Sequence, residues 1–208
     1  MTITHFSPKG FNYLTPGAEA GDKLGPPPFA RIRALDAPLP PDERRLRDAL
    51  GFFATGITVV TARAPGGDPV GLTVNSFNSV SLDPPLVLFS IDRTTRTFAN
   101  VTAASHFAIN VLSEAQRDLS QRFARREPDR WQGIAHVAGE TGVPLLDGCL
   151  ASFECRRETT HDGGDHVIVI GRVLGIRHAA RGRPLLYFRG QYRSVDTVSD
   201  HASLTALD

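Results

Sequence analysis

Short apolar runs in this sequence alternate with turn-forming residues, and most of the runs favour β-strands over helices. A β-branched run at 57–62 and an alternating run at 70–75 flank the turn sequence Pro65-Gly66-Gly67-Asp68, which predicts a hairpin. The continuous apolar run at 86–91 is typical of a central strand. Further strands are expected at 79–82, 106–112, 151–159, 166–176 and 184–188.

Helical spacing is confined to three segments of the sequence. Asp42 can cap the first helix, which Gly56 ends, and the second is expected to start at 92–95 and to end near Ser105. A capping-box pair formed by Ser113 and Gln116 predicts the third helix, over 114–125. The segment that follows, 127–147, carries several glycines and prolines and is expected to form a loop.

The order of these elements argues against a doubly wound α/β fold, because the repeated alternation of strand and helix is missing. Neither GxGxxG nor GxxxxGK[ST] occurs, so a nucleotide, if bound, is not held by either of those loops. The sequence therefore predicts a mainly β fold, an antiparallel barrel with flanking helices.

The domain organisation follows from the distribution of proline. Eight of the 15 prolines fall within residues 1–41, which we interpret as a Pro/Gly-rich N-terminal arm that either wraps the domain or acts as a linker. The folded domain is expected to cover 42–198, with a C-terminal tail at 199–208.

Composition excludes several classes of function. With 23 Lys+Arg against 22 Asp+Glu, the formal charge of +1 argues against nucleic-acid binding through many phosphate contacts. No apolar run is long enough for a membrane span and no signal peptide is visible, so a cytoplasmic protein is expected. Cys149 and Cys155 are interpreted as two buried thiols. A metal cluster of His161, Asp162, Asp165 and His166 on a Gly-Gly turn is disfavoured, so no metal site is predicted.

Polar residues are unusually dense at 71–81, between two apolar strands where a plain core would place Val and Leu. Neutral donors and acceptors at such a position suit a flat heterocycle with carbonyls and ring nitrogens. The alternative is a Ser/Asn-rich turn between strands.

Two further segments are candidates for chemistry. At 90–97 a buried strand leads into a helix start with hydroxyls and with Arg93 and Arg96, which together favour an anion such as phosphate. The alternative is an ordinary helix cap. At 163–166 a Gly-Gly-Asp turn delivers His166 at the start of a strand, where it can position a substrate or be incidental to a hairpin.

Five blocks of sequence together resemble the flavin reductase family, the NAD(P)H:flavin oxidoreductases that serve two-component monooxygenases. The blocks occur in the family's order across about 42–195: GFFATGITVVTA, GLTVNSFNSVSLDPPLVLFSI, SHFAINVLSEAQRDLSQRFA, GDHVIVIGRV and PLLYFRGQYR. The resemblance implies an FMN-binding split β-barrel of Greek-key type. It also implies hydride transfer from NADH or NADPH to FMN or FAD.

The resemblance further implies roles for individual residues. The flavin ring and its ribityl chain would contact Thr73, Val74, Asn75, Ser76, Ser90 and Ile91. Phosphate contacts would come from Arg93, Thr95 and Thr97, although the family often shows a Lys or a Ser run there. Asn110 matches a flavin-edge position, and Phe123 and His166 match positions near the nicotinamide, where His166 would orient the carboxamide.

The same resemblance implies a homodimer and an oxygenase component as partner, with no nucleic acid or membrane involved. Two alternatives stay open. One is a flavoprotein of this fold that keeps its flavin tightly bound and acts on another substrate. The other is a non-catalytic module that binds flavin or a haem-breakdown product.

Overall fold

The computed structural model describes residues 42–125 and 130–195. The predicted arm at 1–41 and tail at 199–208 lie outside the described residues. The chain divides between Leu50 and Gly51 into two compact units.

Helix α1, Glu43–Leu50, is the described part of the N-terminal unit. The side chain of Asp42 accepts a hydrogen bond from the backbone N–H of Arg45 at 2.8 Å, which is the predicted N-cap. The helix ends at Leu50, earlier than the predicted end at Gly56, and none of its residues is buried.

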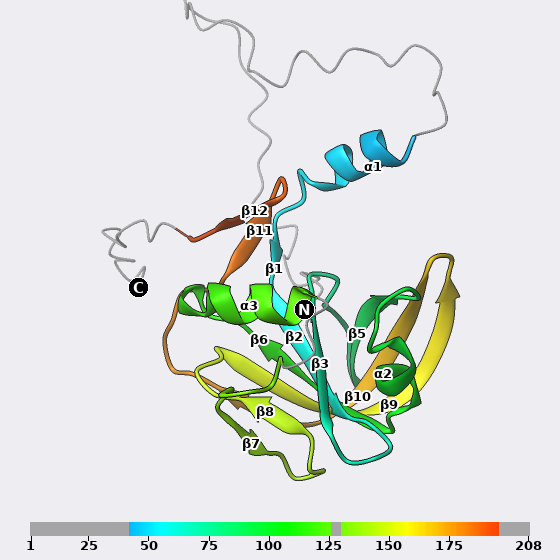
Figure 1. Cartoon of the computed structure of the whole chain (residues 1–208), viewed down its shortest axis with the longest axis vertical. Coiled ribbons are helices and arrows are strands. Elements are labelled where there is room, and N and C mark those ends of the chain that lie inside the picture. Colours follow the sequence, from blue (N-terminus) through cyan, green and yellow to red (C-terminus); the bar gives the residue numbers. More distant parts are fainter. Residues whose placement is uncertain (1–41, 126–129, 196–208) are drawn as a thin grey trace, which may run out of the picture. The chain divides into compact units, whose positions relative to one another are not determined.

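Seven antiparallel strands form the main sheet of the second unit, in the order β3-β2-β6-β9-β10-β5-β4 (Figure 1). Each strand pairs with its neighbours in this order through an antiparallel ladder. The prediction of a mainly β, antiparallel fold is confirmed. The bounds are β2 Thr58–Arg63, β3 Pro69–Val74, β4 Asn78–Leu82, β5 Pro85–Asp92, β6 His106–Val111, β9 Ala151–Gly163 and β10 His166–His178.

The sheet is curled, as the packing of strands near its two ends shows: they share one hydrophobic core. Leu72 and Val74 of β3 pack in the same cluster as Val87, Phe89 and Ile91 of β5. A flat sheet would hold β3 and β5 far apart, since four strands lie between them in the order. Among the described strands, β3 and β4 share no ladder, so the curled sheet stays open along this line.

Helix α3, Arg117–Ala124, lies over the other face of β2 and β3 (Figure 1). Its Phe123 packs with Val59 of β2 in a second core cluster. The close approach requires glycine at position 71, where an added Cβ would lie 2.8 Å from the Phe123 ring. The predicted capping box of Ser113 and Gln116 is present, at a 3₁₀ turn, Glu114–Gln116, that precedes α3.

Several short elements differ from the prediction. Helix α2 covers only Phe98–Ala103. The expected loop at 127–147 contains a two-stranded hairpin, β7 His136–Ala138 and β8 Pro144–Leu146. A further small sheet joins β1 Thr55–Gly56, β11 Leu186–Phe188 and β12 Gln191–Arg193. Strands of two or three residues are too short to show alternation, which is why the sequence pattern missed most of them.

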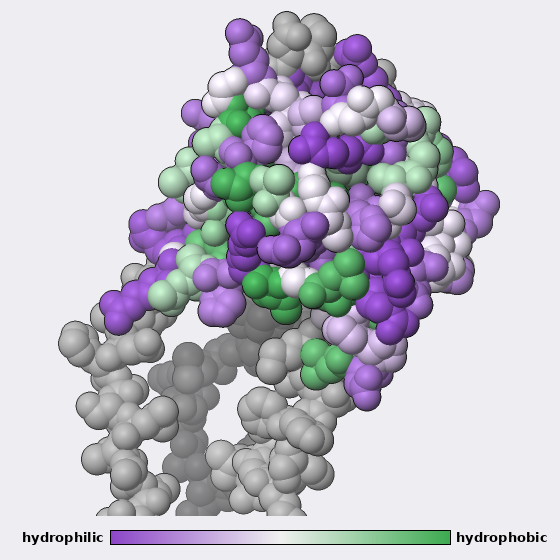
Figure 2. Space-filling model, turned by 90° about the horizontal axis from the view of Figure 1, so that it is seen from below, coloured by the Kyte–Doolittle hydropathy of each residue, from purple (hydrophilic) through white to green (hydrophobic). Residues whose placement is uncertain are grey.

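Large apolar side chains remain exposed on the sheet unit, and they include Phe52, Phe53, Leu82, Leu174 and Ile176. Figure 2 shows hydrophobic patches set among hydrophilic residues on the face seen from below. Within the described part of the chain, no helix is both long enough and apolar enough to cross a membrane.

Candidate functional site

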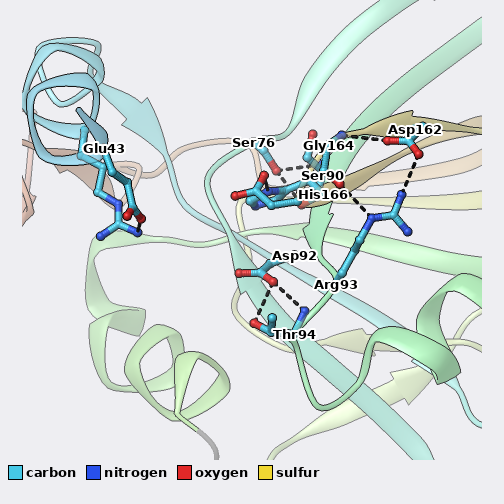
Figure 3. A network of polar contacts seen from close by, with 11 residues as sticks. Glu43, Ser76, Ser90, Asp92, Arg93, Thr94, Asp162, Gly164 and His166 are labelled. Carbon is cyan, nitrogen blue, oxygen red and sulfur yellow. Dashed lines mark hydrogen bonds and ion pairs between the residues drawn. The ribbon is translucent and has the colours of Figure 1, made fainter. Parts of the chain in front are cut away.

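The three polar segments singled out in the sequence come together at one end of β5 (Figure 3). The hydroxyl of Ser76, in the connection after β3, accepts a hydrogen bond from the Ser90 N–H at 2.9 Å and donates to the Ser90 carbonyl at 3.0 Å. On the other side of β5, Asp92 is paired with His166 of β10. The polar connection, the predicted anion turn and the Gly-Gly turn are therefore neighbours.

Strand alternation places several of these side chains on one face. Phe89 and Ile91 point into the core, so Ser90 and Asp92 point to the opposite face of β5. Residues paired in register lie on the same face, and His166 is paired with Asp92. Ser90, Asp92 and His166 therefore line the outer face of the sheet, away from the hydrophobic core.

Arg93 connects the end of β5 to the tip of the β9–β10 hairpin. Its backbone N–H donates to the Asp165 carbonyl at 3.0 Å, and its Nε donates to the Gly164 carbonyl at 2.9 Å. Its Nη2 lies 3.2 Å from a carboxylate oxygen of Asp162. A bond from the Gly164 N–H, and next the charge of Arg93, hold the pKa of Asp162 below its usual value.

His166 is half-exposed, with 40% of its side chain accessible, and its Nδ1 lies 2.7 Å from a carboxylate oxygen of Asp165. An ionised carboxylate can only accept hydrogen bonds, so Nδ1 carries the proton in this contact. In the neutral imidazole, Nε2 is then a hydrogen-bond acceptor.

The turn after β5 is held by a local side-chain contact. One carboxylate oxygen of Asp92 accepts hydrogen bonds from the N–H of Thr94 at 2.6 Å and from its hydroxyl at 2.8 Å. Thr95 is half-buried and Thr97 is 6% exposed. The Thr97 hydroxyl oxygen is buried and has no hydrogen-bond partner within the described residues.

Other side chains assigned to the flavin by the resemblance are engaged inside the protein. Val74, Ile91 and Phe123 are buried in the two core clusters, so any contact from them to a ligand would have to come from the backbone. Thr73 is half-buried and its hydroxyl donates to the Ser120 carbonyl of α3 at 2.7 Å. Asn75, in contrast, is exposed directly beside Ser76.

Asn110 is fully buried, and its amide is saturated by protein groups. Its nitrogen donates to the Val59 carbonyl at 3.0 Å and to the Thr61 hydroxyl at 3.1 Å. Its oxygen accepts from the Leu146 N–H at 3.1 Å and from the Ser152 hydroxyl at 2.9 Å. This amide joins β2, β6, β8 and β9, so a flavin contact at this position, which stays a prediction, would have to come from the backbone.

Sequence reasoning did not predict the roles of three carboxylates that organise this region. Asp92 fixes the turn after β5, Asp162 accepts from Gly164 and Arg93, and Asp165 sets the proton position on His166. The available signal was the spacing of Asp before turn residues in Asp92-Arg93-Thr94 and Asp162-Gly163-Gly164, which is typical of side-chain-stabilised turns.

Two cysteines lie outside this region, within the part of the chain that the structure describes. Burial raises the pKa of the Cys149 thiol to about 11 and that of Cys155 to about 12. Both are free thiols. The described residues contain no group of three or more His, Cys, Asp or Glu side chains placed to hold a metal ion.

The donor set at the end of β5 fits a flavin. The exposed Asn75 amide offers donors and acceptors for a heterocycle, and the half-buried Ser90 and Thr95 lie on the same stretch of chain. The buried Thr97 hydroxyl, which has no partner within the described residues, is a group that an added ligand would satisfy. A phosphate near Thr95 and Thr97 would supply such an acceptor.

Comparison with known proteins places this arrangement in context. A family described as "Flavin reductase like domain" matches residues 50–196. A probable flavin reductase of Rhizobium meliloti is 48% identical over 151 residues, which cover 73% of this chain and 48% of that protein. The chain thus spans about half the length of this relative.

Two further relatives are matched over most of their own length. The reductase subunit HsaB of a flavin-dependent monooxygenase from Rhodococcus jostii is 43% identical over 155 residues, covering 74% of this chain and 79% of that protein. The solved structure of the Streptomyces globisporus NADH:FAD oxidoreductase SgcE6, in complex with NAD and FAD fragments, superimposes with a TM-score of 0.72 at 36% identity. That match covers 76% of this chain and 96% of the other.

Proposed function

Because this chain belongs to the flavin reductase family, as its sequence motifs predicted, we propose that it transfers a hydride from NADH or NADPH to FMN or FAD. We further propose that the reduced flavin is supplied to a partner monooxygenase. The observation that carries the proposal is the convergence of three polar segments, around Ser76, Arg93 and His166, on one end of β5.

The flavin end of the proposed site lies at the connection between β3 and β4. Asn75 would hydrogen-bond the ring system, and Thr95 and Thr97 would contact the phosphate. When bound, the flavin supplies the hydride acceptor, so the protein's task is to hold two rings at short distance and to exclude competing reactions. Two hydrogen bonds with the Ser76 hydroxyl fix the backbone of Ser90 at this end of the site.

The nicotinamide end of the proposed site lies at His166. Its Nε2, an acceptor in the neutral tautomer, would receive a hydrogen bond from the carboxamide N–H₂ of the nicotinamide. Hydride transfer between stacked rings needs no general acid or base from the protein. His166 is therefore assigned to binding and orientation rather than to proton transfer.

The cofactor and partner assignments draw on the relatives. SgcE6 is described as an NADH:FAD oxidoreductase, and HsaB is the reductase subunit of a flavin-dependent monooxygenase. By analogy we assign this chain a flavin and a nicotinamide as small molecules and an oxygenase component as partner. Since such a reductase depends on the cell's nicotinamide pool, the cytoplasm is the proposed compartment.

We also propose a homodimer. On the sheet unit, Leu174 and Ile176 of β10 are exposed, Ile176 by 59%, and Leu82 of β4 is exposed as well. Taken separately, α1 exposes Leu46 and Leu50, four residues apart on one helical face. Burial of such side chains in a second copy would be favourable. Sedimentation at micromolar concentration is expected to give twice the chain mass of 22.5 kDa, and a monomeric mass would contradict the proposal.

One assay tests the proposed activity. The purified full chain is incubated with NADH or NADPH and with FMN, FAD or riboflavin, and nicotinamide oxidation is followed at increasing flavin. If the flavin is a diffusible substrate, the rate of nicotinamide oxidation saturates as flavin is added. If the flavin is tightly bound, its absorbance stays with the protein through purification and added flavin does not change the rate. If nicotinamide oxidation stays at background with every combination, the proposed activity is wrong and a non-catalytic binding module is the remaining alternative.

A further inference from the structure

The Arg93 side chain directs its contacts at the turn between Asp162 and Asp165, where its donors meet the Gly164 carbonyl and the Asp162 carboxylate (Figure 3). We propose that Arg93 is a positioning residue for His166: it fixes the turn that delivers His166, and it is not the ligand of the flavin phosphate. This inference rests on the proposed function, since it assigns a further residue to the nicotinamide end of that site.

The first step of the argument is that the turn needs an external support. It contains two consecutive glycines. Gly164 adopts a φ of +78°, and glycine populates such left-handed conformations about as readily as others, so this φ alone does not fix the turn. A Gly-Gly turn loses much conformational freedom when it is ordered. Beside the ladder pair of Gly163 with His166 that closes it, the turn has one side-chain contact of its own, the bond from the Gly164 N–H to the Asp162 carboxylate at 2.8 Å.

The second step is that Arg93 supplies that support at two points. Nε holds the Gly164 carbonyl at 2.9 Å, and Nη2 lies 3.2 Å from the second carboxylate oxygen of Asp162. The planar guanidinium can reach both acceptors at once because its donors are fixed in a fork. Lysine, with a single ammonium group, lacks this geometry.

The third step connects the turn to His166. Asp165 lies between Gly164 and His166 in the chain, and its carboxylate accepts the Nδ1 proton of His166 at 2.7 Å. A shift of the turn therefore moves the group that sets the tautomer and the ring orientation of His166. Loss of the Arg93 side chain would leave the imidazole free to rotate and to exchange its tautomers, although the bond from the Arg93 N–H to the Asp165 carbonyl remains.

The main test is a double-mutant cycle in the full-length chain. We expect Arg93→Ala to lower kcat/KM for the nicotinamide by about tenfold, the effect of losing one good hydrogen bond, and Arg93→Lys to recover only part of it. In the His166→Ala background, Arg93→Ala should cause less than about a twofold further loss, since the residue it positions is gone. Fully additive losses would overturn the proposal.

Flavin affinity separates positioning from phosphate binding. Arg93→Ala should leave the dissociation constants of both FMN and riboflavin unchanged. Weaker binding of FMN with unchanged binding of riboflavin, which lacks the phosphate, would identify Arg93 as a phosphate ligand and overturn the proposal. Arg172→Ala is the matched control, because it removes an arginine–carboxylate pair with Glu158 on the same hairpin, six residues from His166.

A readout independent of activity keeps this inference distinct from the proposed function. In ¹⁵N NMR of the imidazole, wild-type His166 should show the tautomer protonated at Nδ1, and Arg93→Ala should shift it toward a mixture of tautomers. If the wild type oxidises no nicotinamide with any flavin, the proposed function fails while the NMR comparison still decides the role of Arg93. An unchanged His166 spectrum in Arg93→Ala would contradict positioning.

Discussion

The hydroxyl of Ser76 makes the two hydrogen bonds to the Ser90 backbone that a neighbouring strand would otherwise make. The ladder between β4 and β5 ends at the pair Asn78 and Leu88, and two further residues in the same register would place Ser76 opposite Ser90. The strand has ended at that point, and the hydroxyl of Ser76 bonds both the N–H and the carbonyl of Ser90, at 2.9 and 3.0 Å. This contact lies on the line where the curled sheet stays open, beside the exposed Asn75.

Removal of this hydroxyl should lower stability. In Ser76→Ala the two backbone groups of Ser90 lose their partner in a half-buried position, so we expect a loss of about 1 kcal/mol in the free energy of unfolding. Ser76→Thr keeps a hydroxyl and should lose less. Urea titration measures both variants, and an alanine variant as stable as the wild type would show that water replaces the contact without cost.

Asn110 should be one of the least replaceable polar residues of the described chain. Asn110→Leu leaves the Leu146 N–H facing an apolar side chain, at about 1–3 kcal/mol for a buried group left unsatisfied, and it removes the amide's three other hydrogen bonds as well. Ser152→Ala removes only one of the four contacts and should cost about 1 kcal/mol.

The matched control for Asn110 is Asn78→Ala, which changes an exposed asparagine of β4 and should stay within about 0.5 kcal/mol of the wild type. Thermal or denaturant unfolding measures all three variants. Should Asn110→Leu fail to fold, Ser152→Ala still tests the network. If Ser152→Ala is as stable as Asn78→Ala, the hydrogen bond between Ser152 and the buried Asn110 amide adds nothing to the free energy of unfolding.

Glu154 should make stability dependent on acid. It is 5% exposed, and although desolvation raises its pKa, hydrogen bonds from the Thr141 hydroxyl and from the N–H groups of Thr141 and Glu140 outweigh burial, so that its pKa is lowered overall from 4.5. A lowered pKa in the folded state means that the stabilisation is present above the unfolded-state pKa and is lost as the pH falls through the folded-state value.

We therefore expect the free energy of unfolding of the wild type to fall as the pH drops below 4.5. Glu154→Gln should be less stable at neutral pH and should show a flatter pH dependence in that range, because its amide cannot lose a charge. Urea unfolding at a series of pH values makes the comparison. Parallel curves for the two proteins would mean that Glu154 titrates alike in the folded and unfolded states.

Local pattern was sufficient for the long strands and for the family, but not for the role of each site residue. Alternation in 70–75 predicted β3, yet it did not reveal that α3 covers the face of Thr73 while Val74 faces the core. Both faces of β2 are buried, a consequence of tertiary packing that no residue within β2 signals. The hydrogen-bond partners of the Asn110 amide come from distant strands, so the sequence could not show that this side chain is occupied within the protein.

Local sequence could single out candidate residues for the site, but it could not show their long-range contacts. His166 and Arg93 were singled out as candidates because turn residues surround them in sequence, and the structure brings their two turns into contact. The contact of the Arg93 side chain with this turn could not be predicted from the sequence, because its acceptor, the Gly164 carbonyl, lies 71 positions away in the chain.

The central claim is that one site has a flavin end at Asn75 and a nicotinamide end at His166, and one paired measurement tests it most directly. For Asn75→Leu and His166→Ala, flavin Kd and kcat/KM for the nicotinamide are determined on the same preparations. We predict that Asn75→Leu weakens flavin binding by about tenfold, the equivalent of one hydrogen bond, and that His166→Ala lowers kcat/KM about tenfold with flavin Kd unchanged. Loss of flavin affinity in His166→Ala with unaltered nicotinamide kinetics, or unchanged flavin affinity in Asn75→Leu, would contradict this account.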